Sequence, residues 1–163
     1  MNSHFFLTLL ENSGFDFFTG VPCSYISPLI DLLSKKPFNI HTPAVREDIA
    51  VGLAAGAFLA RKKPLIYMQN SGLGYSLEAF ASLHLIYHFQ ALVLVTYRGP
   101  QDPGMEEHAI MGQHTEEILS TFKLNYSILS QDFSSQKLKH ISTVIEQTSL
   151  PYFLLIPQGV ITS

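Results

Sequence analysis

The segment ALVLV at positions 91–95 is apolar at every position. A strand with one face in water alternates apolar and polar residues, so this run favours a parallel strand that helices cover on both faces. Strand-like and helix-like segments alternate along all 163 residues, and no low-complexity linker, charge block or internal repeat divides them. The sequence therefore predicts one α/β domain over residues 1–163, with a doubly wound, mostly parallel sheet of about six strands and helices on both faces.

Apolar and β-branched runs predict the strands, and helical patterns fill the intervals between them. The expected strands are 15–19, 38–42, 64–69, 91–96, a weak one near Tyr126, and 152–156. The expected helices are 2–13, 25–35, 46–62, 76–89, 115–122 and 134–147, the second of them capped by Ser24. Residues 70–74 are expected to form a glycine loop and residues 97–113 a polar loop.

Charged residues make up 14% of the chain, whereas soluble domains carry about 25%. So few charges predict that part of the surface is covered by another chain. The formal net charge of −3 has the wrong sign for binding a phosphate backbone. Nucleic acid is therefore not an expected partner.

The sole cysteine, Cys23, excludes an internal disulfide and a multi-cysteine metal site, which suits a reducing, cytoplasmic setting. The first residues lack the basic region of a signal peptide. The longest apolar run, Ile49 to Ala60, is shorter than the roughly 20 residues that a membrane span needs. We therefore expect a cytoplasmic protein without membrane contact, in which residues 49–60 form a buried helix.

Ligands of open α/β sheets bind beyond the carboxyl ends of the strands. Four segments of this sequence fall at such ends and carry unusual residues. They are TGVPCS at 19–24, PAVRED at 43–48, QNSGLGYS at 69–76 and the long loop at 97–113.

The first two segments each have a functional and a structural interpretation. Cys23 falls near a helix start, which can activate a thiol, but a lone cysteine is more commonly a buried packing residue. Glu47 and Asp48 stand where acidic residues ordinarily stabilise a helix start. The helix behind them is rich in Ala and Gly, which offer little area to bury. We therefore expect a neighbouring subunit or a flat cofactor to approach this helix closely.

The GxG of residues 72–74 lacks the third glycine of a dinucleotide fingerprint and the lysine of a Walker loop, so it is either a tight turn or a ligand contact. Segment 97–113 is longer than most connections, which favours a functional loop. His84 and His88 stand four residues apart on a helix among apolar neighbours. They are expected to pack or to lie in an interface rather than to bind a metal.

Three of these motifs, in this order, resemble one known family. TGVPCS at 19–24, Arg-Glu-Asp at 46–48 before an Ala/Gly helix, and QNSGLG at 69–74 before a helix are similar to the pyrimidine-binding domain of thiamine diphosphate enzymes. The resemblance spans nearly the whole chain. Within this family the chain looks like the sulfopyruvate decarboxylases, with the phosphonopyruvate decarboxylases close behind. The resemblance implies that 3-sulfopyruvate loses CO2 and leaves sulfoacetaldehyde.

The resemblance also implies roles for single residues. Glu47 matches the glutamate that hydrogen-bonds N1′ of the cofactor's aminopyrimidine, and His108 lies on a loop that matches one near the substrate; these two are the expected catalytic residues. The expected cofactor contacts are Gly20, Val21, Pro22, Glu47, Asn70, Ser71, Gly72 and Gly74. The expected substrate contacts are Cys23, Ser24, Arg46 and Arg98, whose cations suit an anionic C3 group.

The family holds magnesium with a Gly-Asp-Gly motif and a later Asn, and no Gly-Asp-Gly occurs here. The resemblance therefore implies a separate β subunit that carries this motif and holds Mg²⁺. The two subunits would form a hetero-oligomer with thiamine diphosphate at their interface, and this chain would supply no metal ligand.

Two positions depart from the family pattern. Tyr75 stands where relatives commonly have Asn, and Cys23 stands where phosphonopyruvate relatives commonly have an acid, which favours the sulfonate substrate. Three alternatives stay open. They are a phosphonopyruvate decarboxylase subunit that gives phosphonoacetaldehyde, a non-catalytic flavodoxin-like binding module, and a thiol enzyme that uses Cys23 with His108.

Overall fold

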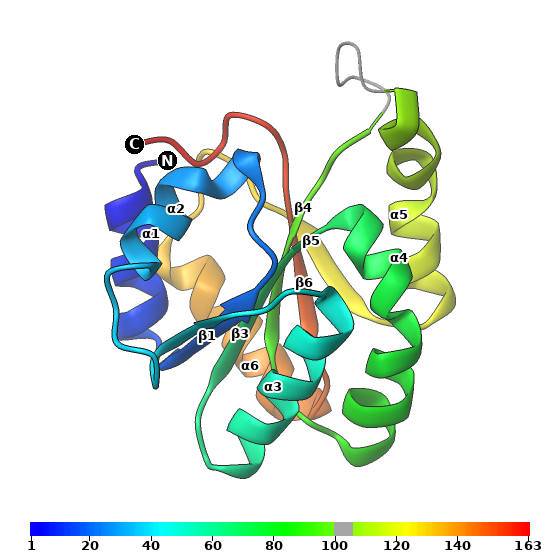
Figure 1. The fold of residues 1–163 in the computed structure, drawn as a ribbon, viewed down its shortest axis with the longest axis horizontal. Helices are drawn as coiled ribbons and strands as arrows, with labels where there is room; N and C mark the ends of the chain where they lie inside the picture. The colour runs from blue at the N-terminus through cyan, green and yellow to red at the C-terminus, as the bar shows by residue number, and fades with distance from the viewer. Residues whose placement is uncertain (100–105) are drawn as a thin grey trace.

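A computed structural model describes residues 1–99 and 106–163, and its strands form a six-stranded sheet in the order β2-β1-β3-β4-β6-β5 (Figure 1). Every neighbouring pair of strands is parallel. The strands are β1 (Phe17–Gly20), β2 (His41–Pro43), β3 (Pro64–Gln69), β4 (Leu92–Thr96), β5 (Asn125–Ile128) and β6 (Tyr152–Ile156). The predicted α/β class, with a parallel sheet of six strands, is confirmed.

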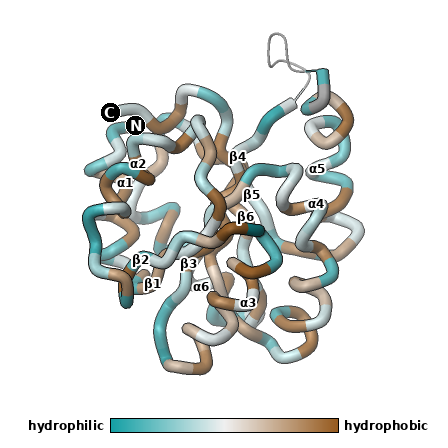
Figure 2. The backbone as a smooth tube through the Cα atoms, viewed as in Figure 1, coloured by the Kyte–Doolittle hydropathy of each residue, from teal (hydrophilic) through white to brown (hydrophobic). Residues whose placement is uncertain are grey.

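Helices cover both faces of this sheet. They are α1 (Ser3–Asn12), η1 (Ser24–Ile26), α2 (Ser27–Leu33), α3 (Glu47–Leu59), α4 (Asn70–Ala79), the π-helical η2 (Phe80–Leu85), η3 (Glu106–His108), α5 (Ala109–Thr121) and α6 (Ser135–Thr148). Helices α1, α2 and α6 pack on one face, and α3, α4 and α5 on the other. Figure 2 shows hydrophobic stretches on the helices of both layers. None of the helices in the described ranges is long and apolar enough to cross a membrane.

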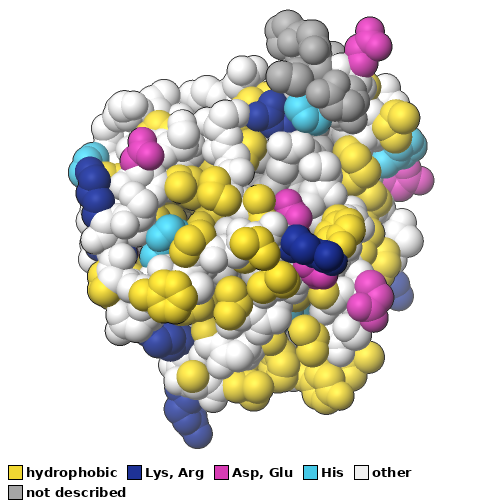
Figure 3. All heavy atoms as spheres, viewed as in Figure 1, with side chains coloured by type: hydrophobic (Ala, Val, Ile, Leu, Met, Phe, Trp, Pro, Cys, Tyr) yellow, Lys and Arg dark blue, Asp and Glu magenta, His cyan; other side chains and the backbone are white. Residues whose placement is uncertain are grey.

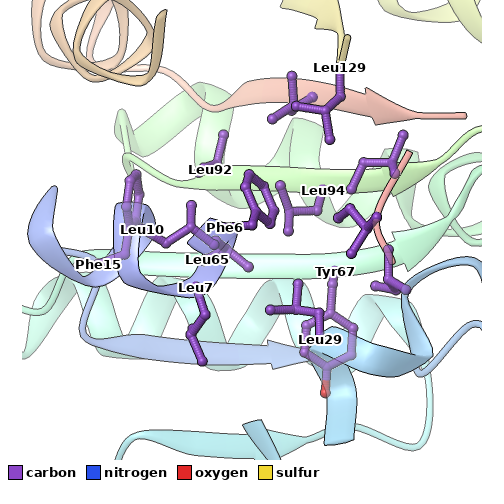
Figure 4. Packing of buried hydrophobic residues seen from close by; sticks show 14 of the residues in the cluster. Phe6, Leu7, Leu10, Phe15, Leu29, Leu65, Tyr67, Leu92, Leu94 and Leu129 are labelled. Atoms are coloured by element: carbon purple, nitrogen blue, oxygen red, sulfur yellow. The ribbon is translucent and has the colours of Figure 1, made fainter. Parts of the chain in front are cut away.

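Strand β3 shows why its sequence is apolar throughout. Leu65 and Tyr67 face the α1 side of the sheet, where Leu65 joins a core with Phe6 (Figure 4). Ile66 and Met68 face the opposite side and belong to the core beneath α3 and α4. A strand that buries both faces has no position for a polar side chain until it reaches its end.

Two predicted loops are wrong. Residues 70–74 are the first turn of α4 rather than a glycine loop, because Gly72 and Gly74 provide room for packing instead of a turn. In segment 97–113, η3 begins at Glu106 and α5 begins at Ala109. Helix α5 thus begins six residues before the predicted helix start at Thr115. Residues 100–105 of this segment lie outside the described residues.

Helix α5 is pressed against the chain that leaves β4. A Cβ atom added to Gly112 would lie 2.1 Å from the Cα of Gly99, so these two backbones touch. Further along α5, the hydroxyls of Tyr97 and Tyr126 donate to the two carboxylate oxygens of Glu116, at 3.0 and 3.2 Å. Burial and the Glu116 carboxylate raise the pKa of Tyr97 to about 12, so this donor is kept at neutral pH. These contacts fix α5 over β4 and β5.

Candidate functional site

The carboxyl end of β1 is pressed onto β3 at Gly20. A Cβ atom there would lie 1.9 Å from the carbonyl oxygen of Tyr67, so only glycine fits. The missing side chain also leaves room for the Tyr67 ring, whose hydroxyl lies 2.8 Å from Nε2 of His41 on β2. Burial raises the pKa of Tyr67 to about 12. Beyond Gly20, the Val21 N–H donates to the Tyr67 carbonyl at 3.0 Å, which holds the predicted 20–22 segment at the end of the sheet.

Glu47 begins α3 and lies against the first turn of α4. A Cβ atom on Gly72 would come within 2.3 Å of Glu47 Cγ and 2.5 Å of its Oε1. The half-buried carboxyl therefore rests on bare backbone, and a flat ring could approach it without a side chain at position 72. Position 74 is also tight, because a Cβ atom there would lie 2.9 Å from the terminal methyl group of Met111.

Asn70, the first residue of α4, is 1% exposed. Its Nδ2 donates to the Arg98 carbonyl at 2.6 Å and to Thr115 Oγ1 at 3.1 Å. Its Oδ1 has no hydrogen-bond partner among the described residues. A buried acceptor without a donor is costly, so this oxygen suits a bound group that supplies an N–H or O–H. The neighbouring Ser71 is exposed, and its Oγ accepts from the Gln69 amide at 3.0 Å.

Arg98, which follows β4, brings three predicted substrate contacts together. Its guanidinium donates to Ser24 Oγ at 2.6 Å and lies 3.7 Å from Cys23 Sγ. The same guanidinium lies over the Tyr25 ring, with Cζ 4.2 Å from the ring centroid. The Arg98–Ser24 cluster (Cys23, Ser24, Tyr25 and Arg98) therefore presents a cation in a fixed orientation at the carboxyl edge of the sheet.

Cys23 is buried, as the packing interpretation predicts, although it precedes η1. Its sulfur lies 3.1 Å from the hydroxyl of Thr96, which donates to it, and 3.8 Å from Gln69 Oε1. Ser24 lies inside η1 and does not cap it, since Cys23 occupies the cap position and makes no side-chain cap bond. The predicted capping role of Ser24 is therefore wrong, and its hydroxyl is engaged by Arg98 instead.

Arg46 points away from this cluster. Its guanidinium forms a two-point ion pair with Asp48, at 3.2 and 2.8 Å, and donates to the Tyr75 hydroxyl. It also lies 4.9 Å from the centroid of the Tyr75 ring. The hydrogen bonds from Arg46 lower the pKa of Asp48. In the isolated chain Arg46 and Tyr75 thus link the starts of α3 and α4 on the outer surface.

His108 ends η3 and stands immediately before α5. It is half-buried, in the segment that follows β4. His84 is fully buried in η2, which confirms that it packs, whereas His88 is exposed. Within residues 1–99 and 106–163, no three His, Cys, Asp or Glu side chains gather in a way that could hold a metal ion.

Three polar residues at the site have no assigned role in the sequence prediction: Tyr25, Gln69 and Thr96. Gln69 is the last residue of β3 and Thr96 the last of β4, and both contact Cys23. Their signal was present in the sequence, because a polar residue that ends an apolar strand stands at the ligand-binding edge of a parallel sheet. The sequence around Tyr25 gave no such signal, because the contact of its ring with the Arg98 guanidinium depends on the tertiary fold.

Residues 2–117 match the model of the thiamine pyrophosphate enzyme N-terminal TPP binding domain. The chain belongs to this family. The Glu47 carboxyl lies against the backbone of Gly72, and Asn70 has a buried oxygen that can accept a hydrogen bond. Both features fit an aminopyrimidine ring, which has ring nitrogens and an amino group.

Curated relatives of this TPP-binding domain include the sulfopyruvate decarboxylase subunit alpha of Methanothermobacter thermautotrophicus, 36% identical over 72% of this chain and 71% of the relative. The subunit of the same name from Methanocaldococcus jannaschii is 33% identical over 90% of this chain and 87% of the relative. Phosphonopyruvate decarboxylase of Streptomyces viridochromogenes is 32% identical over 87% of this chain but only 36% of its own length.

Among solved structures, the thiamine diphosphate-dependent 4-hydroxybenzoylformate decarboxylase of Rhodococcus jostii superposes with a TM-score of 0.73 at 16% identity. The match covers 99% of this chain and 31% of that one. Benzoylformate decarboxylase from Polynucleobacter necessarius gives a TM-score of 0.70 at 16% identity over 95% of this chain and 29% of that one. At these identities the two structures show a common fold for the TPP-binding domain.

Proposed function

We propose that this chain, as one unit over residues 1–163, is the pyrimidine-binding subunit of a thiamine diphosphate-dependent decarboxylase that converts 3-sulfopyruvate to sulfoacetaldehyde and CO2. The observation that carries the proposal is the Glu47 carboxyl on the bare backbone of Gly72, at the carboxyl edge of the sheet. The similar chains named sulfopyruvate decarboxylase subunit alpha support the substrate. The similar phosphonopyruvate decarboxylase supports the alternative substrate, phosphonopyruvate, with phosphonoacetaldehyde as product.

Thiamine diphosphate, when bound, would supply a thiazolium ring that takes up the electrons of the bond to the departing carboxylate. The residues of this chain hold and prepare that group. The Glu47 carboxyl would share a proton with the aminopyrimidine nitrogen N1′ and would thereby favour loss of the proton at thiazolium C2. Asn70 Oδ1 would accept a hydrogen bond from the cofactor, and segments 20–22 and 70–74 would provide backbone for the ring to contact.

Substrate recognition belongs to the Arg98–Ser24 cluster in this proposal. The Arg98 guanidinium and the Ser24 hydroxyl would donate hydrogen bonds to the anionic group on C3. Cys23 places an uncharged side chain beside them, which suits a singly charged sulfonate. Arg46 would join them only after release from Asp48 and Tyr75. His108 stands on the substrate side, where it can donate or accept a proton at the carbon that loses CO2.

A partner subunit completes the site in this proposal. Helix α3 exposes an apolar stripe of four residues at helical spacing, Ile49, Gly52, Gly56 and Leu59, and Val45 is exposed just before the helix begins. Val45 is 84% and Leu59 68% exposed, and a Cβ atom at Gly52 or Gly56 would meet no atom within 4 Å. Residues 49–60 are thus buried along one side only, which corrects the prediction of a buried helix. Figure 3 shows hydrophobic side chains gathered over α3 and the neighbouring α4.

We assign to this face a β subunit that carries Gly-Asp-Gly and a later Asn, holds Mg²⁺, and binds the diphosphate of the cofactor. Its helix would pack closely against the two open glycines. The low content of charged residues, 14%, agrees with a surface that is covered in a hetero-oligomer. The single, buried cysteine agrees with a cytoplasmic location.

The decisive experiment replaces Glu47 by Gln in the complex with the partner subunit, thiamine diphosphate and magnesium. Gln has nearly the same shape but cannot cycle the proton, so C2 hydrogen–deuterium exchange and decarboxylation should fall by roughly a hundredfold or more. Asp48→Asn is the matched control, because Asp48 is the next residue and its carboxylate is engaged by Arg46. It should leave both rates near those of the wild type.

A non-catalytic flavodoxin-like module predicts a different outcome. If Glu47 only stabilised the start of α3, Glu47→Gln would cost about 0.3–1 kcal/mol of stability and change no chemical rate. Wild-type exchange in the Gln variant would therefore contradict the proposed function. A panel of 3-sulfopyruvate and phosphonopyruvate on the same complex distinguishes the two substrates.

A further inference from the structure

His84 is a buried histidine that the proposed chemistry does not use. It lies in η2 with none of its surface exposed, between the rings of Phe80 and Phe89, whose centroids are 5.6 and 6.0 Å from that of the imidazole. Its Nδ1 lies 2.8 Å from the Phe89 carbonyl oxygen, and its Nε2 lies 3.2 Å from the Val51 carbonyl oxygen. One ring therefore connects the end of η2 with the middle of α3.

Both contacts of this ring are to acceptors. Carbonyl oxygens cannot donate, so a contact is a hydrogen bond only when the ring nitrogen that faces the carbonyl carries a hydrogen. A neutral imidazole carries one such hydrogen and can fill one of the two contacts at a time. A phenylalanine at position 84 would keep the aromatic packing and lose both. Because each ring nitrogen has its own carbonyl, the two contacts can be removed separately by substitution.

The Val51 carbonyl lies one turn beyond Glu47 in the same helix. Helices α3 and α4 meet at two places along this line. Near their starts the Glu47 side chain rests on Gly72, and one turn further along α3 the Val51 carbonyl meets His84 at the far end of the α4–η2 helix. A π-helical segment changes the direction of the side chains that follow it, and such segments recur at functional sites. Here the segment carries the residue that reaches across to α3.

We propose that His84, with the hydrogen of its neutral ring on Nε2, is a positioning residue for Glu47: the hydrogen bond from Nε2 to the Val51 carbonyl fixes the position of α3 along α4 and so places the Glu47 carboxyl over Gly72. The inference rests on the proposed function of Glu47. Loss of the contact lets α3 slide along α4, and a displacement of about 1 Å at a reacting group can cost a hundredfold in rate.

The test uses three variants in the complex with the partner subunit, thiamine diphosphate and magnesium. In His84→Gln the amide nitrogen stands near the position of Nε2, so the contact with Val51 is kept. In His84→Asn it stands near the position of Nδ1, so only the contact with Phe89 is kept. His84→Phe keeps neither. At a temperature well below unfolding, we expect the Asn and Phe variants to lower C2 exchange and kcat ten- to a hundredfold with little change in KM, and the Gln variant to stay within about threefold of the wild type.

A second measurement does not depend on turnover. Amide hydrogen exchange of residues 47–52 in the isolated chain should become at least about tenfold faster in His84→Asn and His84→Phe but not in His84→Gln. If the Phe variant does not fold, the comparison of Gln with Asn decides the question.

Wild-type C2 exchange in His84→Phe, or an Asn variant that outperforms the Gln variant, would overturn the inference. Glu47→Gln, measured in parallel, distinguishes a failure of the His84 inference from a failure of the proposed function. An impaired Glu47→Gln beside an unimpaired His84→Phe overturns only the role of His84. An unimpaired Glu47→Gln overturns both this inference and the proposed function.

Discussion

The Glu47 side chain lies on the backbone of Gly72 so closely that a Cβ atom at position 72 would come within 2.5 Å of its Oε1. Gly72→Ala therefore forces the carboxyl to move. We expect decarboxylation by the complex to fall at least about tenfold, and the isolated chain to lose about 1–3 kcal/mol through overpacking. Gly52→Ala is the control for folding, because a methyl group there meets no atom and alanine favours a helix by about 1 kcal/mol. Equal stabilities of the two variants would contradict this geometry.

Arg98 is the cation that the fold orients, whereas Arg46 is engaged by Asp48 and Tyr75. Arg98→Ala should raise KM for the anionic 2-oxo acid roughly ten- to a hundredfold, because a charge-assisted hydrogen bond contributes about 1.5–3 kcal/mol. Arg98→Lys should recover only part of this, since an ammonium group cannot lie flat on Tyr25 and donate to Ser24 as the guanidinium does. A larger KM effect from Arg46→Ala would transfer the assignment to Arg46.

Cys23 provides a test of the thiol alternative. A serine at this position still accepts a hydrogen bond from Thr96 and still contacts Arg98, so Cys23→Ser should retain most of the turnover of the complex. Steady-state kinetics on a variant whose folding is verified by circular dichroism decides the matter. Complete loss of activity in a folded variant would favour nucleophilic attack by the thiol, with His108 as its base.

The open glycines of α3 predict how assembly responds to bulk. Gly56→Phe should leave the isolated chain folded, since position 56 faces empty space. The same substitution should weaken binding to the β subunit at least about tenfold, because the added ring keeps the partner helix from close approach. Sedimentation equilibrium of mixed subunits measures this. Unchanged affinity would place the partner on another face.

Two buried histidines predict how stability depends on pH. Burial lowers the pKa of both His41 and His84 below 6.5, so the folded chain holds these rings neutral while the unfolded chain protonates them more readily. Stability from this source is complete above pH 6.5 and is lost as the pH falls below it, because the unfolded state then binds more protons. Urea unfolding of the isolated chain between pH 8 and pH 5 should show this loss. The slope should be smaller in His41→Gln and in His84→Gln; an unchanged slope in both would contradict it.

The sequence predicted best those elements whose burial is uniform. Strand β3 has the predicted bounds, Pro64–Gln69, because an apolar run between Pro64 and a polar end residue can be only a covered strand. The first turn of α4 was not predicted, because Gly72 and Gly74 are usual signals of a loop. Their function here depends on Glu47 and Met111, which lie far away in the sequence. A local pattern cannot distinguish a glycine that turns the chain from one that makes room for a neighbour.

The same limit applies to the site. The place of Glu47 at a helix start followed from its motif, and the structure puts it there. The direction of Arg46 did not follow, because it depends on Tyr75 across the α3–α4 contact. The cluster around Arg98 needed the carboxyl ends of β1 and β4 to lie at one edge of the sheet with only β3 between them, which the strand order provides.

The contact between Gly99 and Gly112 fixes the chain that leaves β4 against α5. Because these two backbones touch, the chain between them starts and ends at one fixed base. A change of length before Glu106, where η3 begins, would leave this contact between the chain after β4 and helix α5 in place, and lengthening a closed segment costs little entropy. Exchanging this segment between homologues is a practical route to altered selectivity.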